Sequence, residues 1–140
     1  MIPNFNEYGL LPKGIHKATI EEIEHRFGSG SAKRKELFIG FQKLIQLLYK
    51  HKRSIKSFLL DGSFVTNKES PEDYDCILVV KKDFNFDSPE AKKLLNAKEL
   101  FYAHNFTCME EDFDQYHRLF DLFGHEKDTE RPKGLVEVIL

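Results

Sequence analysis

The stretch Asp73–Val80, "DYDCILVV", constrains the fold more than any other part of the chain. After its two acids it is apolar and rich in β-branched residues, without the polar–apolar alternation of a half-exposed strand. This composition predicts a strand that is buried on both faces. The other segments have to supply the sheet around it and the layers that cover it.

Several segments have the period or the end signals of helices. Thr19 followed by Glu22 forms a capping box, which starts a helix that Gly28 ends. Ser88 as N-cap and Pro89 at the first position start another. The expected helices cover Thr19–Gly28, Lys35–Arg53, Ser88–Asn105 and Asp112–Gly124. In the second of these, apolar residues recur at helical spacing, namely Leu37, Phe38, Phe41, Leu44, Ile45 and Leu48.

Short apolar runs predict strands at Ile55–Leu60, Asp73–Val80, Asn105–Glu110 and Leu135–Leu140. Residues 1–17 contain Pro and Gly without a period, so they are expected to form an N-terminal arm. This order of elements predicts an α+β fold, a mixed β-sheet of about four strands flanked by helices. At 140 residues the chain is expected to be a single domain, 1–140.

Charge and composition exclude several classes of partner and site. The net charge of −2 gives no global field that would attract nucleic acid or an anionic membrane. The local basic clusters, such as Lys33–Lys35, are expected to be solvated faces. Cys76 and Cys108 lie in apolar runs, which is typical of buried thiols rather than of a disulfide or zinc site. No membrane span or signal peptide is evident, so the expected location is the cytoplasm.

Two acids at the start of the strand, Asp73 and Asp75, are the first candidate functional residues. Residues i and i+2 of a strand point to one face, so their carboxylates should lie side by side, with Tyr74 on the opposite face. Adjacent carboxylates repel, and a divalent cation removes that repulsion. Oxygen ligands favour Mg²⁺ or Mn²⁺. The alternative interpretation is a strand that simply begins in solvent.

The pair Gly62-Ser63 follows the preceding strand and is the second candidate. Gly62 has no Cβ and lets a phosphate approach the backbone, while the Ser63 hydroxyl and nearby N–H groups can donate to it. A phosphate cradle next to a metal pair is the minimum equipment for moving a nucleotidyl group, where catalysis is mainly positioning and charge neutralisation.

The segment "DGSFVTNKESPEDYDCILVV" resembles the Gly-Ser…Asp-x-Asp core of the nucleotidyltransferase superfamily related to DNA polymerase β, in its minimal form. More narrowly, the chain resembles a small bacterial nucleotidyltransferase-like family of unknown function. Three regions carry the resemblance and frame most of the chain: "FNEYGLLPKGIH" with "EEIEHRFG", then "GSFVTNKESPEDYDCILVV", and "KGLVEVIL". It implies a minimal nucleotidyltransferase fold, with Gly62 and Ser63 at the nucleotide phosphates and Asp73 and Asp75 at Mg²⁺.

Relatives typically add a third carboxylate from a neighbouring strand, which activates the attacking hydroxyl. In this chain Thr107 stands where that acid is expected, and Glu110 is the nearest substitute. Lys68, in the loop after Gly-Ser, is a candidate for neutralising a triphosphate, against the simpler interpretation of a solvated lysine. His104 could reach the site, although a histidine that caps a helix end is the stronger expectation. Asp61 is expected to help form the turn, with a metal role as the minority interpretation.

Two functions are consistent with these residues. The first is a Mg²⁺-dependent nucleotidyltransferase that moves NMP, with AMP favoured, from an NTP to a hydroxyl of a protein, an RNA end or a small molecule. The alternative is a catalytically impaired module of the same fold. It would act as a nucleotide sensor, or as the partner protein in a toxin–antitoxin or phage-defence pair. The neutral Thr107 favours the second function, and the Gly-Ser…Asp-x-Asp pattern favours the first.

Overall fold

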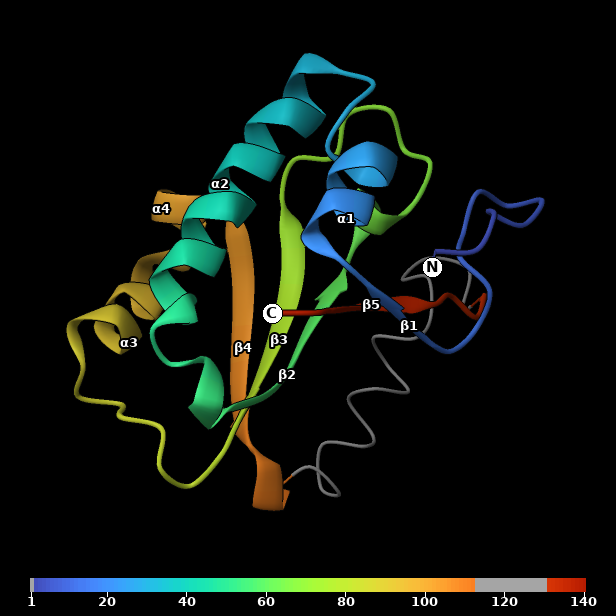
Figure 1. The fold of residues 1–140 in the computed structure, drawn as a ribbon. Helices are drawn as coiled ribbons and strands as arrows, with labels where there is room; N and C mark the ends of the chain where they lie inside the picture. The colour runs from blue at the N-terminus through green and yellow to red at the C-terminus, as the bar shows by residue number, and fades with distance from the viewer. Residues whose placement is uncertain (1, 113–130) are drawn as a thin grey trace.

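One mixed sheet forms the centre of the computed structural model, which describes residues 2–112 and 131–140. Its strands are β1 (Ile15–Ala18), β2 (Ile55–Asp61), β3 (Tyr74–Val80), β4 (Ala103–Met109) and β5 (Leu135–Val138). Their order across the sheet is β1-β5-β2-β3-β4 (Figure 1). The pairs β1–β5 and β3–β4 are parallel, whereas β5–β2 and β2–β3 are antiparallel. The α+β class and the mixed sheet are therefore confirmed, with five strands rather than four.

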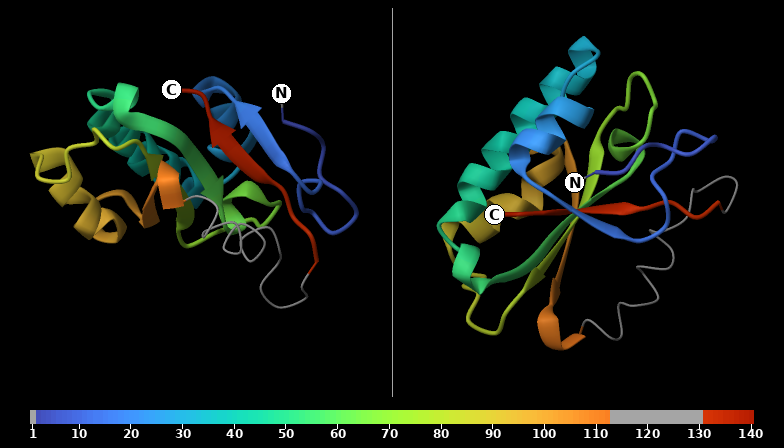
Figure 2. Two further views of the ribbon diagram at one scale, coloured as in Figure 1. Left: turned by 90° about the horizontal axis from the view of Figure 1, so that it is seen from below. Right: turned by 45° about the vertical axis from the view of Figure 1, so that its right-hand side comes forward.

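The helices are α1 (Ile20–Phe27), α2 (Ala32–Tyr49), α3 (Pro89–Lys93) and α4 (Ala97–Phe101). Helices α1 and α2 pack on one face of the sheet, and α3 and α4 lie near its β4 edge (Figures 1 and 2). The predicted capping box starts α1, because the Thr19 hydroxyl accepts from the Glu22 N–H at 3.1 Å and Glu22 Oε1 accepts from the Thr19 N–H at 3.3 Å. Helix α2 starts before the predicted Lys35, because the Ser31 hydroxyl caps it.

The main core lies between α2 and the sheet. Every residue of the predicted apolar stripe of α2 is buried. The ring of Phe41 stacks on Phe58 of β2 at 6.3 Å and meets Tyr74 of β3 edge-on at 6.0 Å. Burying one such side chain contributes about 1.5–3 kcal/mol to folding. This layer fixes the positions of β2 and β3 relative to each other and to α2.

Strand β1 was not expected, because the sequence predicts an irregular arm over residues 1–17. Only Ala18 of this four-residue strand is buried, so no apolar period marks it. Its partner is β5, at the other end of the chain, with Ile15 opposite Leu135 and Ala18 opposite Val138. A parallel strand at the edge of a sheet is defined by such distant hydrogen bonds, and these leave no local pattern in the sequence.

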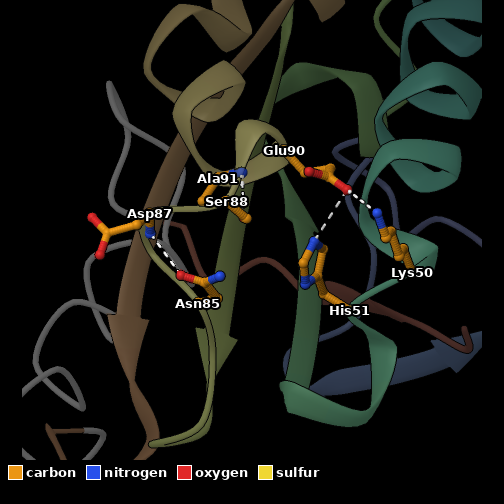
Figure 3. Close-up of polar contacts among 7 residues, drawn as sticks. All are labelled: Lys50, His51, Asn85, Asp87, Ser88, Glu90 and Ala91. Atoms are coloured by element: carbon orange, nitrogen blue, oxygen red, sulfur yellow. Dashed lines mark hydrogen bonds and ion pairs between the residues drawn. The ribbon is translucent and has the colours of Figure 1, made fainter.

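The single helix predicted over Ser88–Asn105 is wrong, because the segment breaks into α3, a 3-10 turn and α4. Its start is confirmed, since the Ser88 hydroxyl accepts from the Ala91 N–H at 3.1 Å. Glu90 then contacts Lys50 Nζ at 3.2 Å and His51 Nε2 at 3.4 Å, which ties α3 to the end of α2 (Figure 3). Tyr102 ends α4 in the left-handed conformation, with φ of 60°, and the chain enters β4 earlier than predicted.

The two faces of β3 are both covered by side chains, as its composition predicts. Tyr74, Cys76, Leu78 and Val80 belong to the main core on the helix side. Ile77 and Val79 join a smaller cluster with Leu59 of β2 and Cys108 of β4 on the other face. We call this second face the open face, a name that means only that it is opposite the face on which α1 and α2 pack, since Ile77 and Val79 are buried there. The candidate acids lie at the end of the open face.

Two further predictions concern a C-terminal helix and membrane-spanning segments. Nearly all of the helix expected over Asp112–Gly124 lies outside the described residues. Within residues 2–112 and 131–140, no helix is long and apolar enough to span a membrane.

Candidate functional site

Asp73, Asp75 and His104 form a cluster on the open face. Asp73 and Asp75 are partly exposed, and Tyr74 between them is completely buried in the main core, so the predicted separation of faces is confirmed. In the parallel pairing of β3 and β4, His104 lies opposite Asp75. Its Nε2 is 3.5 Å from Asp73 Oδ2 and its Nδ1 is 3.4 Å from Asp75 Oδ1. One ligand atom from each residue lies within 4.8 Å of the others, close enough for all three to bind one metal ion.

Asp61 adds a third carboxylate at the same end of the sheet. It is the last residue of β2 and lies opposite Asp75 in the antiparallel pairing of β2 and β3. Unlike the other two acids it is completely buried, and its Oδ1 lies 3.0 Å from Nζ of Lys133. Among the described residues, the contacts at this end of the sheet therefore join three carboxylates, the ammonium group of Lys133 and the His104 ring. The excess of negative charge favours a bound cation.

The Gly-Ser bend lies directly against these acids. Gly62 has φ of 84° and ψ of −174°, a conformation that is essentially restricted to glycine. A Cβ at this position would lie 3.0 Å from Asp75 Oδ2 and 3.3 Å from Asp75 Cγ. Ser63 then begins a short 3-10 turn, in which Ser63 O accepts from the N–H and from the hydroxyl of Thr66. The Gly-Ser bend therefore lies next to the carboxylate cluster, at the same end of the sheet.

Arg34 holds the loop that follows the bend. Its guanidinium is buried and donates to the carbonyls of Phe64 (2.7 Å), Thr66 (2.7 Å) and Lys68 (2.6 and 3.1 Å). It also donates to the carbonyl of Phe27, at the end of α1, at 3.1 Å. The prediction that the cluster Lys33–Lys35 is a solvated face is wrong for Arg34, whose side chain points into the loop and fixes the turn beside Gly62.

Three residues singled out in the sequence are not brought into the cluster. Thr107 lies opposite Leu78 and accepts a hydrogen bond from Asn105 at 2.8 Å, so it is on the helix side of β4. Glu110 follows β4 at the opposite end of the sheet from Asp75, where it contacts Lys56 at 3.9 Å. Lys68 contributes a backbone carbonyl to Arg34, and its side chain is exposed.

His104 and Lys133 are the functional candidates that sequence reasoning misjudged or missed. The expectation that His104 caps a helix end is wrong, because α4 ends at Phe101 and His104 is the second residue of β4. The parallel register of β3 and β4 decided its place. Lys133 comes from the segment before β5, and the antiparallel pairing of β5 with β2 brings it to Asp61. Only the fold, and no spacing in the sequence, joins residues 61, 75 and 133.

The environment shifts the pKa of two of the acids in the same direction. Burial raises the pKa of the Asp75 carboxyl above 3.8, and the neighbouring charge of Asp73 raises it further, while His104 and Lys133 oppose the shift. Burial also raises the pKa of Asp61, against the effect of Lys133. Burial, followed by the charge of Asp75, raises the pKa of the Cys76 thiol, which makes it a poor nucleophile. The site therefore favours protonation or an added cation over free carboxylates.

We expect the raised pKa of Asp75 to appear in the pH dependence of stability. The folded protein binds the Asp75 proton more tightly than the unfolded chain does, so the stabilisation is complete below pH 3.8 and is lost as the pH rises through the raised pKa. Without metal, the unfolding free energy of the wild type relative to Asp75→Asn should therefore fall as the pH increases. Urea unfolding in chelator across this range measures the difference. Parallel pH profiles for the two proteins would contradict the assignment.

Comparisons with known proteins identify the family without assigning an activity. The family model described as "Family of unknown function (DUF6932)" matches residues 3–139. No curated protein and no solved structure matches the chain. Because the matched residues cover nearly the whole sequence, the chain belongs to the DUF6932 family.

Proposed function

We propose that this protein is a metal-dependent nucleotidyltransferase with a minimal nucleotidyltransferase-like fold. The observation that carries the proposal is the closeness of Gly62 to the Asp75 carboxylate, because a Cβ at Gly62 would lie only 3.0 Å from Asp75 Oδ2. A nucleotidyl transfer site needs its phosphate-binding bend and its metal-binding acids within the span of one bound triphosphate. The resemblance of "GSFVTNKESPEDYDCILVV" to the superfamily core supports the same function.

Each residue of the cluster has a role in this proposal. Asp73 and Asp75 hold Mg²⁺ or Mn²⁺, which when bound neutralises charge on the phosphates and polarises the α-phosphorus. The Ser63 hydroxyl donates to the phosphate oxygens, and Gly62, which has no Cβ, lets the bend lie against the Asp75 carboxylate. Arg34 keeps that turn in place.

The reaction is a displacement at the α-phosphorus of an NTP, with ATP favoured. The acceptor hydroxyl oxygen forms the new bond to phosphorus, and the bond to the bridging oxygen breaks, so that pyrophosphate leaves with the electron pair. We assign the acceptor proton to His104, because its ring lies beside both metal-binding carboxylates. The acceptor is a hydroxyl of a protein, an RNA end or a small molecule.

The test is transfer from ATP labelled on the α-phosphate, compared with ATP labelled on the γ-phosphate. With Mg²⁺ or Mn²⁺, only the α-label should move to an acceptor or to the protein itself, and chelator should stop the transfer. Transfer of the γ-label alone would show phosphoryl transfer instead. Hydrolysis or transfer that is indifferent to chelator would refute the metal role.

A second candidate is favoured by the composition of β4. On the open face this strand presents His104, Phe106 and Cys108 and no carboxylate. A chain without a carboxylate on this strand can retain nucleotide binding and lose turnover, and would then act as a sensor or as the partner of another protein. Calorimetry with a non-hydrolysable ATP analogue and Mg²⁺ distinguishes the two. Binding without any transfer supports the sensor, and turnover excludes it.

A further inference from the structure

We propose that Lys133 binds the polyphosphate of the nucleotide and that Asp61 positions it to do so. The inference rests on the proposed function, and it names the residue that recognises the anionic part of the substrate. The loop lysine Lys68 is the obvious candidate in the sequence, but its side chain is exposed and only its backbone contributes to the structure around Gly62. Lys133 lies instead beside the acids and the bend.

The position of Lys133 follows from the sheet. Strand β5 pairs with β2 so that Val136 lies opposite Leu60. The residues before β5 therefore extend toward the end of β2, where Asp61 is the last residue and Gly62 follows. Lys133 Nζ lies 3.0 Å from Asp61 Oδ1, and its charge also acts on Asp75. An ammonium group at this place lies at the same end of the sheet as the Gly-Ser bend and the metal-binding acids.

Asp61 is more deeply buried than Lys133, as expected if Asp61 positions the lysine and the lysine binds the nucleotide. The Asp61 side chain is 2% exposed, so its contact with Lys133 is shielded from water. The Lys133 side chain is 12% exposed, so part of it remains accessible. An ammonium group has three donor hydrogens, and one carboxylate oxygen does not use them all. The remaining donors are available to phosphate oxygens.

If the ion pair between Asp61 and Lys133 served only to stabilise the fold, its desolvation would make it an unfavourable arrangement. Removing two charges from water costs several kcal/mol, and an apolar pair of similar volume is often as stable or more stable. The pair lies next to Asp75, which contributes to the metal-binding cluster and lies against the Gly-Ser bend. Asp61 holds the long lysine side chain in one position, which reduces the entropy lost when a phosphate binds.

The experiment compares nucleotide binding in charge-matched variants. Lys133→Met alone would leave Asp61 buried without a partner and lower stability, so the informative variant is Asp61→Asn with Lys133→Met. This double variant keeps the net charge of the wild type and contains no buried lone charge. Lys43→Met, an exposed position on α2, is the control for substitution of a lysine, and Lys68→Met tests the rival loop lysine. Circular dichroism and urea unfolding establish that each variant is folded.

Binding of a non-hydrolysable ATP analogue with Mg²⁺ is measured by calorimetry. The double variant should bind about 10- to 100-fold more weakly than the wild type, the effect of losing a charged hydrogen-bond donor. Lys43→Met and Lys68→Met should bind like the wild type. A folded double variant with wild-type affinity, or a loss of affinity confined to Lys68→Met, would overturn the inference and leave the proposed function standing. A wild type that binds no nucleotide would refute both.

Discussion

Replacing Arg34 with methionine is expected to lower the free energy of unfolding by about 3–5 kcal/mol, the largest effect on stability that we predict. All five N–H groups of the guanidinium are used, in bonds of 2.6–3.1 Å to four backbone carbonyls. Methionine keeps the length of the side chain but leaves these carbonyls without their donors. Two of these bonds, to Phe27 and Phe64, are buried, so water cannot fully replace them.

The acceptors of all these bonds are backbone carbonyls rather than carboxylates, so the geometry of the guanidinium matters in addition to its charge. Burial lowers the pKa of Arg34, but an arginine remains charged at neutral pH. Lysine at this position keeps the charge and offers at most three donors from one point, so Arg34→Lys should have an intermediate effect. Lys35→Met is the matched control on the exposed side of α2 and should change stability by less than about 0.5 kcal/mol.

Urea unfolding of the four proteins measures these differences. Hydrogen exchange adds a local readout, because the amides of Val65 and Thr66 donate to the carbonyls of Gly62 and Ser63, within the loop that Arg34 holds. Their protection should fall in Arg34→Lys even where the global stability is retained. A methionine variant as stable as the wild type would show that the loop is held by other contacts.

Changing Asp73 and Asp75 together to asparagine is expected to reduce nucleotidyl transfer by at least about a thousandfold, to background. Asparagine has the shape of aspartate without its charge, so the substitution removes the metal-binding charge with little change in packing. A bound divalent cation contributes several kcal/mol of charge stabilisation in the transition state, which corresponds to this factor. The label from α-phosphate-labelled ATP measures the loss.

The same double variant should be more stable than the wild type when no metal is present. Burial raises the pKa of Asp75 and the charge of Asp73 raises it further, so the two charges oppose folding at neutral pH. Thermal unfolding in chelator should show a higher midpoint for the variant, and Mg²⁺ should stabilise the wild type alone. Asp83→Asn, at an exposed position after β3, is the control for losing an acid. Persistent label in the folded double variant would remove Asp73 and Asp75 from the mechanism.

Local signals in the sequence explain which parts of the fold and site were predictable. Thr19 with Glu22 and Ser88 with Pro89 act within one helical turn, and the structure confirms both starts. The alternation of Asp73, Tyr74 and Asp75 depends only on the pleat of a strand, so their faces followed from the residue order. The bend at Gly62 was likewise recognisable beside the strand that it ends.

Features that depend on pairing between distant segments were not predictable in this way. Strand β1 exists only because β5 pairs with it. A change in the register of β4 by one residue would exchange the faces of His104 and Asn105, and nothing in "NFTCME" itself specifies that register. The burial of Arg34 required the loop of residues 64–68 to fold over it.

By itself, the sequence determined the class of the fold, the central apolar strand and the pairing of Asp73 with Asp75 on one face, because these follow from periods and caps within a few residues. The tertiary structure alone decided that Asp61, His104 and Lys133 join them, and that Thr107 and Glu110 do not. The physical reason is that hydrogen bonds across a sheet set which distant residues become neighbours, and the register of those bonds is selected by packing of the whole core.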